Sequence, residues 1–350
     1  MINSNFNGGT MIRKYRLLSA FALIAAAAAI FSCGTAGLAD GLYAKIKTAK
    51  GNIVINLEYE RTPLTVANFV GLAEGTLQIT DGIHFYDGLT FHRVEPGFVI
   101  QGGDPRADGT GSAGYLFPDE IVPELKHNVP GIVAMANSGP NTNGSQFYIT
   151  LAALEPLDGR YSIFGEVVQG MDVVKRIEKG DKMLKVTIVR VGAKAKAYKA
   201  TQEYWDELFG SSVAMLRQRS AEERKLILEQ IKARWPGLKE GERGLLTQVL
   251  KEGTGEKVYH SVLAHVKYKA MLPNGVVFDR SEVNGEDLVF EVGSGQVLPG
   301  WDFAMLGMKK GEKKIVAIPP ELAYGSQGFQ KIIPPNSYIV LELELTDIEW

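Results

Sequence analysis

Few of the side chains that usually carry catalysis are grouped in this sequence. Its 350 residues include five His and one Cys, so a zinc cluster or a disulfide framework has almost no ligands to draw on. His92 stands beside Arg93 but has no partner at metal-binding spacing, and we expect it to form hydrogen bonds behind a site. The other histidines are scattered along the chain: His84, His127, His260 and His265. The sequence therefore predicts no metal site.

A glycine-rich segment, Gly109–Gly114, satisfies the G-x-G-x-x-G pattern of dinucleotide-binding loops. That pattern binds a pyrophosphate only where it follows a strand and opens a helix. Pro105 and Pro118 bracket the segment, which indicates a loop instead. The formal net charge of -2 gives no general reason to expect nucleic acid or an anionic membrane surface as partner. We expect neither a nucleotide nor any other cofactor.

Three long motifs in the first half carry a much stronger signal. They are FHRVEPGFVIQGGD (Phe91–Asp104), MANSGPNTNGSQFYIT (Met135–Thr150) and LDGRYSIFGEV (Leu157–Val167). Together they closely resemble the cyclophilin family, from about Tyr43 to Gly192. The resemblance implies a closed eight-stranded antiparallel β-barrel capped by two helices. It also implies cis/trans isomerisation of prolyl peptide bonds at a site on the outer wall of that barrel.

The resemblance assigns a role to individual residues of these motifs. Arg93 is the implied catalytic cation, with Phe98 and Gln101 beside it. Gln101 and the Asn137 backbone would hold the main chain of the substrate. The residues implied to bind the proline and its neighbours are Phe98, Val99, Asn137, Gln146, Tyr148, Leu157 and Tyr161.

Isomerisation needs neither a nucleophile nor a metal, because no covalent bond is broken. The rotational barrier of roughly 18–20 kcal/mol comes from the partial double-bond character of the C–N bond. A dry apolar pocket can hold the proline ring, while a cation aimed at the freed lone pair of the nitrogen or at the carbonyl oxygen favours the twisted amide. Each 1.4 kcal/mol of that preference is worth about tenfold in rate.

Some positions depart from the family pattern. Val99 stands where Met is usual, Tyr148 where Phe is usual, and Tyr161 at a common His position. Pro156 stands where cyclosporin-sensitive members carry a Trp that contacts the drug. We expect catalysis to survive and cyclosporin binding to be weak.

The C-terminal part, Gly241–Trp350, holds three further motifs: VKYKAMLPNGVVFDRS, VLPGWDFAMLGMKKGEK and IPPELAYGSQGFQKIIPPNSYIVLELELTDI. They resemble the FKBP family. The resemblance implies a five-stranded antiparallel sheet wrapped on a short helix, which Pro299-Gly300-Trp301 opens. The same reaction is implied here in a second, unrelated pocket.

Trp301 is the implied floor under the proline ring of this second pocket. Asp279 and Tyr324 form its polar rim, and Ile332 closes one side. The implied walls are Tyr268, Phe278, Val297, Leu298 and Leu341, with the Leu298 N–H binding a substrate carbonyl. Such an aromatic pocket suits desolvation of the amide, because water favours the planar, charge-separated form. Leu288 and Leu341 replace a common Phe and Phe329 a common His, and an FK506-type ligand is a candidate partner.

Hydrophobic periodicity supplies the elements that position these residues. Ile53, Ile55 and Leu57 alternate with polar residues as in a half-buried strand, and Thr65–Ala73 has helical spacing. Further apolar stretches at 131–136 and 146–151, a short helix near 171–177 and a strand at 185–191 complete the first half. In the second, Val262–Tyr268 and Val276–Phe278 flank a Pro273-Asn274-Gly275 turn, and Ile339–Leu345 alternates as a strand buried on one face.

Between the two halves, Thr201–Arg234 contains no Pro and one Gly, and its apolar residues recur at three- and four-residue spacing. We predict an amphipathic helical region, interrupted near Gly210-Ser211-Ser212 and ended by Trp235-Pro236-Gly237. Its apolar stripe packs either on the chain's own domains or on a second copy. The predicted organisation is a signal at 1–39, a cyclophilin-like domain at 41–195, a helical connector at 196–237 and an FKBP-like domain at 238–350.

The N-terminal segment reads as an export signal. From Met11 a basic stretch precedes the apolar run Leu17–Phe31, which is too short and wrongly flanked for a stable membrane span. The run ends in Ile30-Phe31-Ser32-Cys33-Gly34, which resembles the lipobox of bacterial lipoproteins, where Cys33 would carry the lipid. The alternative is ordinary cleavage after Ala39. Either reading places the mature protein outside the cytoplasm, in the periplasm or cell envelope.

The sequence thus predicts a dual prolyl isomerase that acts on proline-containing unfolded or partly folded polypeptides and helps secreted proteins to fold. The alternative is a holding chaperone or scaffold whose pockets bind proline segments with little relevant turnover. A third reading is division of labour, with one catalytic and one mainly binding domain. Intact Arg93, Asp279, Trp301 and Tyr324 favour the enzyme.

Overall fold

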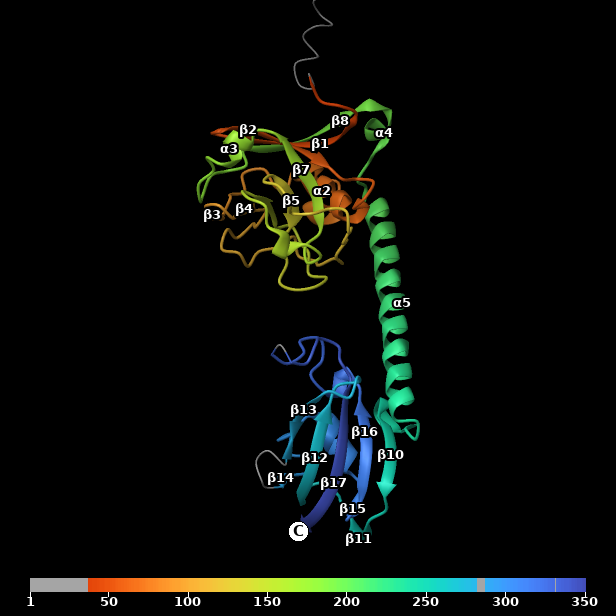
Figure 1. The fold of residues 1–350 in the computed structure, drawn as a ribbon. Coiled ribbons are helices and arrows are strands. Elements are labelled where there is room, and N and C mark those ends of the chain that lie inside the picture. Colours follow the sequence, from red (N-terminus) through yellow and green to blue (C-terminus); the bar gives the residue numbers. More distant parts are fainter. Residues whose placement is uncertain (1–36, 282–286, 331) are drawn as a thin grey trace, which may run out of the picture. The chain divides into compact units, whose positions relative to one another are not determined.

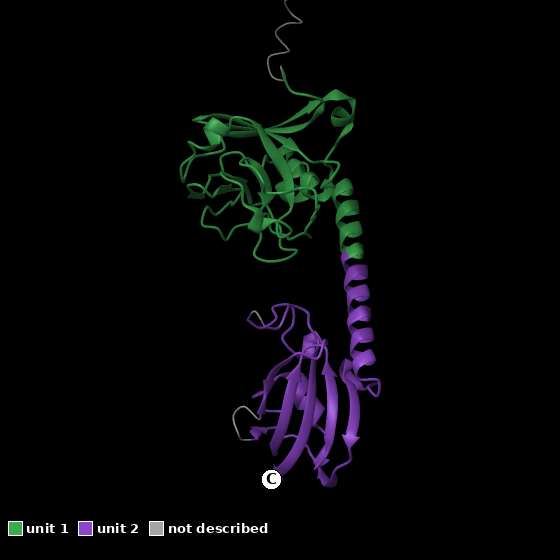
Figure 2. Ribbon diagram, viewed as in Figure 1, with its two compact units in different colours: residues 1–215 green, residues 216–350 purple. Residues whose placement is uncertain are grey.

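The computed structural model describes residues 37–281, 287–330 and 332–350. The chain divides into two compact units, the first ending at Met215 and the second running from Leu216 to Trp350 (Figure 2). The division falls inside the segment predicted as a helical connector. Cys33 and the basic and apolar stretches of the predicted export signal lie outside the described residues.

The first unit is built on one antiparallel sheet of eight strands in the order β3-β4-β6-β5-β7-β2-β1-β8 (Figure 1). The strands are β1 (Gly41–Thr48), β2 (Gly51–Leu57), β3 (Arg93–Glu95), β4 (Val99–Gly102), β5 (Ile132–Met135), β6 (Phe147–Thr150), β7 (Ile163–Gln169) and β8 (Lys185–Val191). Within the described ranges no ladder joins β3 to β8, so the sheet is eight-stranded and antiparallel but the pairing of its strands does not close it.

Helix α2 (Pro63–Glu74) packs on the inner face of this sheet, where its residues from Leu64 to Ala73 are buried. Its first turn is fixed by Glu120, whose carboxylate accepts hydrogen bonds from the N–H groups of Leu64 and Thr65 at 3.1 and 2.6 Å. The helix ends at Gly75, which adopts the left-handed conformation that glycine reaches without strain. Shorter elements complete the unit: η1 (Gln78–Thr80), η2 (Glu155–Leu157), α3 (Met171–Val174) and α4 (Gly192–Ala197).

Strands β4, β5 and β6 are buried on both faces. Because successive side chains point to opposite sides of a strand, they divide between two clusters. The inner cluster, packed against α2, receives Ile100, Val133, Met135, Phe147 and Ile149. A smaller outer cluster is formed by Val99, Ile132, Ala134, Tyr148 and Ile163. The outer cluster matters for function, since it places apolar side chains on the outward face of the sheet.

Helix α5 runs without interruption from Gln202 to Arg234, so the predicted break near Gly210-Ser211-Ser212 is wrong. A glycine inside a helix costs about 1 kcal/mol relative to Ala, and no Pro is present to remove a hydrogen bond, so the flanking helix formers carry the helix through. Trp205 joins the core of the first unit, and Ile231 is fully buried in a cluster of the second. Both ends of the apolar stripe are therefore covered within their own unit.

The second unit carries a seven-stranded antiparallel sheet, ordered β13-β12-β17-β16-β10-β9 with β14 also paired to β12. Its strands are β9 (Lys239–Glu240), β10 (Leu246–Lys251), β12 (Leu263–Met271), β13 (Val277–Arg280), β14 (Leu288–Glu291), β16 (Lys313–Ile318) and β17 (Ile339–Glu349). The remaining elements are η3 (Glu242–Gly244), η5 (Pro320–Leu322), helix α6 (Pro299–Met305) and the paired strands β11 (Thr254–Lys257) and β15 (Lys309–Lys310).

The expected number of strands in this sheet, five, was wrong. Strands β13 and β14 pair with successive parts of β12 and so share one edge of the sheet. The two-residue strand β9 extends the other edge.

Strand β17 departs from the expected one-sided burial. Leu341, Leu343 and Leu345 face the cluster that contains α6, as their alternation predicts. Val340, on the opposite face, is fully buried as well. It lies in the cluster that Ile231 of α5 joins. The second face is therefore covered by the end of α5, which the pattern of β17 alone does not reveal.

No helix among those of the described ranges is both long and apolar enough to cross a membrane.

Candidate active sites

The first candidate site is organised around Arg93, which β3 and β4 bring opposite Gln101 in the sheet register. The Arg93 Nη1 donates to Gln101 Oε1 at 3.0 Å. Its Nε and Nη2 donate to Glu95 Oε1 at 3.0 and 2.7 Å. The guanidinium carbon lies 5.8 Å from the centre of the Phe98 ring. Arg93 is thus fixed in orientation at the surface, with an aromatic side chain under its charge. Glu95 was not predicted as a site residue.

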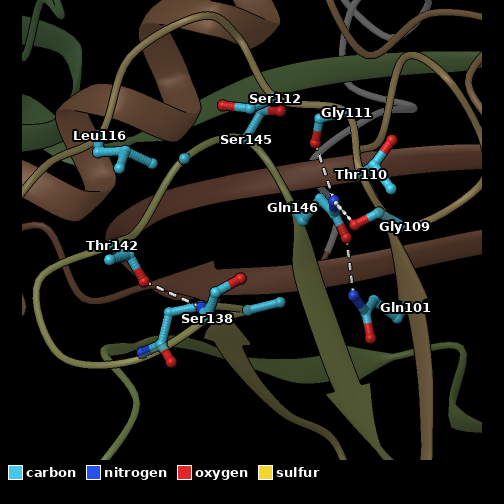
Figure 3. A pocket seen from close by; sticks show the side chains of 13 residues that line it. Gln101, Gly109, Thr110, Gly111, Ser112, Leu116, Ser138, Thr142, Ser145 and Gln146 are labelled. Carbon is cyan, nitrogen blue, oxygen red and sulfur yellow. Dashed lines mark hydrogen bonds between the residues drawn. The ribbon is translucent and has the colours of Figure 1, made fainter. Parts of the chain in front are cut away.

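A chain of amide groups extends this arrangement (Figure 3). Gln101 Nε2 donates to Gln146 Oε1 at 2.8 Å. Gln146 Nε2 in turn donates to the carbonyl oxygens of Gly109 and Gly111 at 3.0 and 2.8 Å. The glycine-rich segment is therefore a loop, as predicted, and its carbonyl groups are used to hold Gln146.

Asp104 shapes the same loop, although the sequence did not single it out. Its carboxylate accepts hydrogen bonds from the N–H groups of Arg106 at 2.7 Å and Gly109 at 2.5 Å. Burial acts to raise the pKa of Asp104, but these hydrogen bonds outweigh it and hold the pKa below its ordinary value. A side chain at Gly111 would collide with that carboxylate and displace it from these hydrogen bonds.

The loop borders an open pocket of about 480 Å³ (Figure 3). Its lining residues are Gln101, Gly109, Thr110, Gly111, Ser112, Leu116, Ala136, Asn137, Ser138, Thr142, Gly144, Ser145 and Gln146. The predicted substrate-binding residues Asn137 and Gln146 both lie here. Ala136 also packs against the outer apolar cluster, so the pocket and that cluster adjoin.

The predicted proline pocket coincides with the outer cluster of the sheet. Val99 and Tyr148 are buried members of it, and Phe98, Leu157 and Tyr161 pack against it while partly exposed. The rings of Tyr148 and Tyr161 meet edge to face at 5.6 Å. The structure therefore brings together all the residues predicted for the first site.

Two histidines behave differently from expectation. His92 is buried, and among the described residues neither of its ring nitrogens has a hydrogen-bond partner, so the predicted hydrogen-bonding role is wrong. Burial lowers its pKa, which keeps the ring neutral. His127, treated as an isolated residue in the sequence, instead contacts the hydroxyl of Tyr148 through Nε2 at 2.9 Å.

The second candidate site is built around Trp301, at the start of α6. The side chain is 7% exposed, and the rings of Tyr268 and Phe290 meet it edge to face at 4.9 and 6.4 Å. Phe290 was not predicted as a site residue. The predicted wall residues Phe278, Val297 and Leu298, with Tyr268 and Tyr324, pack partly exposed against the same cluster.

A carboxylate and two tyrosines form the polar part of this site. The Tyr268 hydroxyl donates to Asp279 Oδ2 at 2.9 Å across the β12–β13 ladder. Burial, helped by the hydrogen bond to Asp279, raises the pKa of Tyr268 to about 12. The pKa of Tyr324 is also raised, by burial and then by the charge of Asp279. Both tyrosines therefore stay neutral at physiological pH.

Two predicted residues of the second site take different places. Leu341 is fully buried in the cluster that contains Trp301, so it offers no surface to a ligand. Ile332 is half exposed, and its neighbour Ile333 is the residue that packs into the cluster. Leu288 packs on the cluster, and the Phe329 ring lies 5.2 Å from that of Tyr324.

The two sites differ in their charged groups. The first presents the guanidinium of Arg93, whereas the polar side chains of the second are Asp279 and two neutral tyrosines. Within the part of the chain that the structure describes, no group of three or more His, Cys, Asp and Glu side chains is placed to hold a metal ion.

Comparison with known proteins gives a separate result for each unit. Residues 43–193 match the family model of the cyclophilin type peptidyl-prolyl cis-trans isomerases. Residues 255–346 match that of the FKBP-type peptidyl-prolyl cis-trans isomerases.

Curated relatives agree with the first match. The chain is 48% identical over 145 residues to peptidyl-prolyl cis-trans isomerase A of Mycobacterium tuberculosis, which covers 39% of the chain and 80% of that protein. It is 49% identical over 139 residues to peptidyl-prolyl cis-trans isomerase B of Streptomyces anulatus, which covers 37% of the chain and 78% of that protein. It is 49% identical over 136 residues to peptidyl-prolyl cis-trans isomerase ppi1 of Schizosaccharomyces pombe, which covers 38% of the chain and 83% of that protein.

Proposed function

The chain belongs to the cyclophilin-type peptidyl-prolyl cis-trans isomerases and carries an FKBP-type domain after its cyclophilin-type domain, and we propose that both of its pockets are working sites. The enzyme interconverts the cis and trans forms of the bond that precedes proline. The observation that carries the proposal is the arrangement of the first site, where Arg93 stands oriented beside an apolar cluster on the outer face of the sheet.

In the first site, the proline ring would rest on Phe98, Tyr148 and Leu157, away from water. Of the five N–H donors of a guanidinium, Arg93 uses three on Glu95 and Gln101, which leaves two for the substrate. Donated to the proline nitrogen or the neighbouring carbonyl oxygen, they bind the twisted amide more strongly than the planar one. Because Glu95 and Gln101 hold the guanidinium in place, little reorganisation accompanies the rotation.

In the second site, the work would be done mainly by the exclusion of water. The ring of Trp301 offers a flat floor for the proline, and Tyr268 stands edge-on to it. Water stabilises the charge-separated, planar form of an amide, so transfer into this aromatic pocket favours the less polar, twisted form. Asp279 accepts a hydrogen bond from the Tyr268 hydroxyl, which holds both side chains in place at the rim.

The closing of the first sheet into a barrel is also a proposal. The segments that lead into β3 and β8 are joined by backbone hydrogen bonds: Gly88 N to Met183 O, Met183 N to Leu89 O and Phe91 N to Asp181 O, at 2.7 to 2.8 Å. These bonds would close the sheet behind the pocket, and a closed sheet has no free edge at which the site could deform.

The cellular role that we propose is assistance to the folding of secreted or envelope proteins. Uncatalysed prolyl isomerisation takes tens to hundreds of seconds at 25 °C, which is slow enough to limit folding. The proposal rests on the sequence before Gly37, which reads as an export signal with Cys33 at a lipobox-like position. Metabolic labelling with a radioactive fatty acid tests it: label on the wild type and none on Cys33→Ser supports the anchor, and unlabelled, cleaved wild type supports secretion without one.

Drug binding provides a further expectation for the first site. Pro156 lies exposed in η2, next to the pocket residue Leu157, and offers no indole to cyclosporin. We expect a calorimetric titration of the full chain with cyclosporin to show weak binding. A nanomolar dissociation constant contradicts this. For the second pocket, an FK506-type ligand remains the candidate to test in the same way.

A protease-coupled prolyl-peptide assay tests the proposed sites. We expect the wild-type chain to be active and the double variant Arg93→Ala/Asp279→Val to lose nearly all of that activity. Lys196→Ala, an exposed residue of α4, serves as the control and should match the wild type. Full activity in the double variant contradicts the site assignment. An inactive wild type supports a proline-binding scaffold instead.

A further inference from the structure

A continuous hydrogen-bond chain runs from the surface of the first unit to the proline pocket. Asp158 Oδ1 lies 2.9 Å from His127 Nδ1, and His127 Nε2 lies 2.9 Å from the Tyr148 hydroxyl. The same Asp158 oxygen accepts the backbone N–H of His127 at 2.8 Å. The side chain of His127 is fully buried, whereas that of Asp158 is 19% exposed. One end of the chain is thus open to solvent and the other ends on a pocket residue.

The ionisation state of Asp158 determines where the protons of this hydrogen-bond chain lie. Burial acts to raise the pKa of Asp158, but the hydrogen bonds from the backbone and ring of His127, with the nearby charge of Lys126, outweigh it and lower the pKa. An ionised carboxylate can only accept, so His127 Nδ1 must donate to it. In the neutral ring, Nε2 then carries the lone pair, and the Tyr148 hydroxyl must donate to Nε2.

Tyr148 is fixed by more than this one hydrogen bond. It lies in β6 among the outer cluster and is 4% exposed. Its ring stacks against that of His127 at 6.0 Å with an angle of 20°, and Tyr161 meets it edge to face on another side. The hydroxyl proton is therefore used on His127 and is not offered to the pocket. A tyrosine held in this way presents only its ring to a proline.

We propose that His127 and Asp158 are positioning residues of the first site, which hold the Tyr148 hydroxyl away from the proline pocket so that the pocket stays apolar. The inference rests on the proposed function of this site. It explains how a tyrosine can stand where a phenylalanine is usual without bringing a polar group to the proline. His127 touches neither substrate nor Arg93 and acts through Tyr148.

The hydrogen bonds from Asp158 through His127 to Tyr148 make the pocket sensitive to the protonation of His127. The charged and titratable groups that face the His127 ring are Asp158, with Lys126 behind it, on one side, and Tyr148, with Tyr161 behind it, on the other. A protonated ring donates from both nitrogens, so Nε2 can no longer accept from the hydroxyl. The hydroxyl proton must then turn elsewhere within the apolar cluster, and the pocket loses its shape or gains a polar group.

The pH range follows from the surroundings of His127. Burial lowers its pKa below the ordinary value of 6.5, although the hydrogen bond to Asp158 acts in the opposite direction. The ring is therefore neutral at pH 7 and becomes charged only below pH 6.5. We expect kcat/KM of the first site to fall in that acid range, and we expect this fall to require the Tyr148 hydroxyl.

A double-mutant cycle tests the inference. The full chain carries Asp279→Val throughout, so that the first site is measured alone, and kcat/KM is determined at pH 7.5 and across pH 5 to 8. His127→Leu leaves the hydroxyl without an acceptor, and we expect it to lower kcat/KM by about tenfold, the kinetic equivalent of one unsatisfied buried donor. In the presence of Tyr148→Phe, the same His127→Leu change should have little further effect, because no hydroxyl remains to be held.

The pH profile adds a readout that a purely structural histidine would not move. We expect the acid fall of kcat/KM in the parent chain and its absence in Tyr148→Phe. His127→Gln provides a folding-tolerant variant, since its amide can donate to Asp158 and accept from the hydroxyl; it should lose less activity than His127→Leu and show no acid fall.

The inference is overturned if His127→Leu lowers kcat/KM by the same factor with and without Tyr148→Phe, or if the acid fall persists in Tyr148→Phe. Failure of the proposed function looks different. Arg93→Ala, made in the same Asp279→Val chain, would then leave kcat/KM unchanged, whatever the result of the His127 cycle.

Discussion

The two sites proposed for this chain are built from different groups. In the first unit the residues proposed to hold the proline lie on the outward face of a sheet, beside an oriented guanidinium and two glutamine amides. In the second unit they lie around the start of a short helix and include a tryptophan that belongs to the core. A barrier that arises from amide resonance can be lowered by charge aimed at the twisted form or by removal of the water that favours the planar form.

The two proposed sites also hold a tyrosine hydroxyl in two ways. Tyr268 donates directly to the carboxylate of Asp279, whereas Tyr148 reaches Asp158 only through His127. The direct contact keeps a charge at the rim of the second pocket. The interposed histidine moves the charge of Asp158 away from the first pocket. In each case the hydroxyl has an acceptor, which matters most for Tyr148 because it is buried.

The largest effect is expected from Trp301→Ala. The change removes both the floor of the second pocket and part of the core, so the free energy of unfolding of the second unit should fall by about 3–5 kcal/mol and the activity of its site should disappear. Chemical denaturation and the peptide assay measure the two effects. Trp350→Ala, at a residue that is 70% exposed, is the matched control. A Trp301→Ala chain that is stable and, with Arg93→Ala also present, still active contradicts the account of the second pocket.

The next effect belongs to Arg93 and should leave stability nearly unchanged, because the side chain is 43% exposed. In an Asp279→Val chain, Arg93→Ala should lower kcat/KM by about 10²–10³, the range found when one oriented donor to a developing charge is removed. Arg93→Lys should recover only part of this, since an ammonium cannot bind Glu95 and Gln101 with a planar fork. Arg176→Ala, another exposed arginine, is the control. Equal activity of the Lys and Arg chains would show that orientation is unimportant.

A smaller effect concerns the pH dependence of stability in the first unit. Burial lowers the pKa of His127, so the unfolded chain binds a proton near pH 6.5 while the folded chain binds it only at lower pH. Stability is therefore fully present above pH 6.5 and is lost as the pH falls toward the folded pKa. Thermal unfolding of wild type and His127→Gln between pH 7.5 and 5 isolates this contribution from that of His92, whose pKa is lowered as well. Parallel curves for the two chains contradict it.

The smallest effect is expected at Gly210 in α5. The residue is exposed, and a side chain added there meets nothing within 4 Å. Gly210→Ala should stabilise helix α5 by up to about 1 kcal/mol and should affect neither active site. Circular dichroism during thermal unfolding measures the change. A loss of helix in this variant would support the interruption that the sequence suggested.

The site residues were predicted from motifs and the fold around them partly from periodicity. The residues proposed for the first site follow from the resemblance of dense motifs to a family, and the structure places these residues close together. The partners of those residues were harder to find. Glu95 lies two residues after Arg93 on β3, a spacing that places both on one face of the strand. His127 and Asp158 lie in loops between the strands, and no spacing in the sequence reveals their contact.

The errors about the fold have separate physical causes. A pattern of alternating residues describes the face that a strand buries by itself, and not what covers the other face. Val340 is buried because the end of α5 lies over it, and α5 continues through Gly210 because helical neighbours outweigh a single glycine. His92 was expected to form hydrogen bonds, but it is buried and both of its ring nitrogens lack a partner among the described residues.

The most direct test of two independent sites is a comparison of kcat/KM in four full-length chains: wild type, Arg93→Ala, Asp279→Val and the double variant. Each single variant should keep the activity of its untouched pocket, so that the two single values add up to the wild-type value and the double variant has almost none. If one single variant abolishes all activity, or if the double variant keeps it, the account of two separate working pockets is wrong.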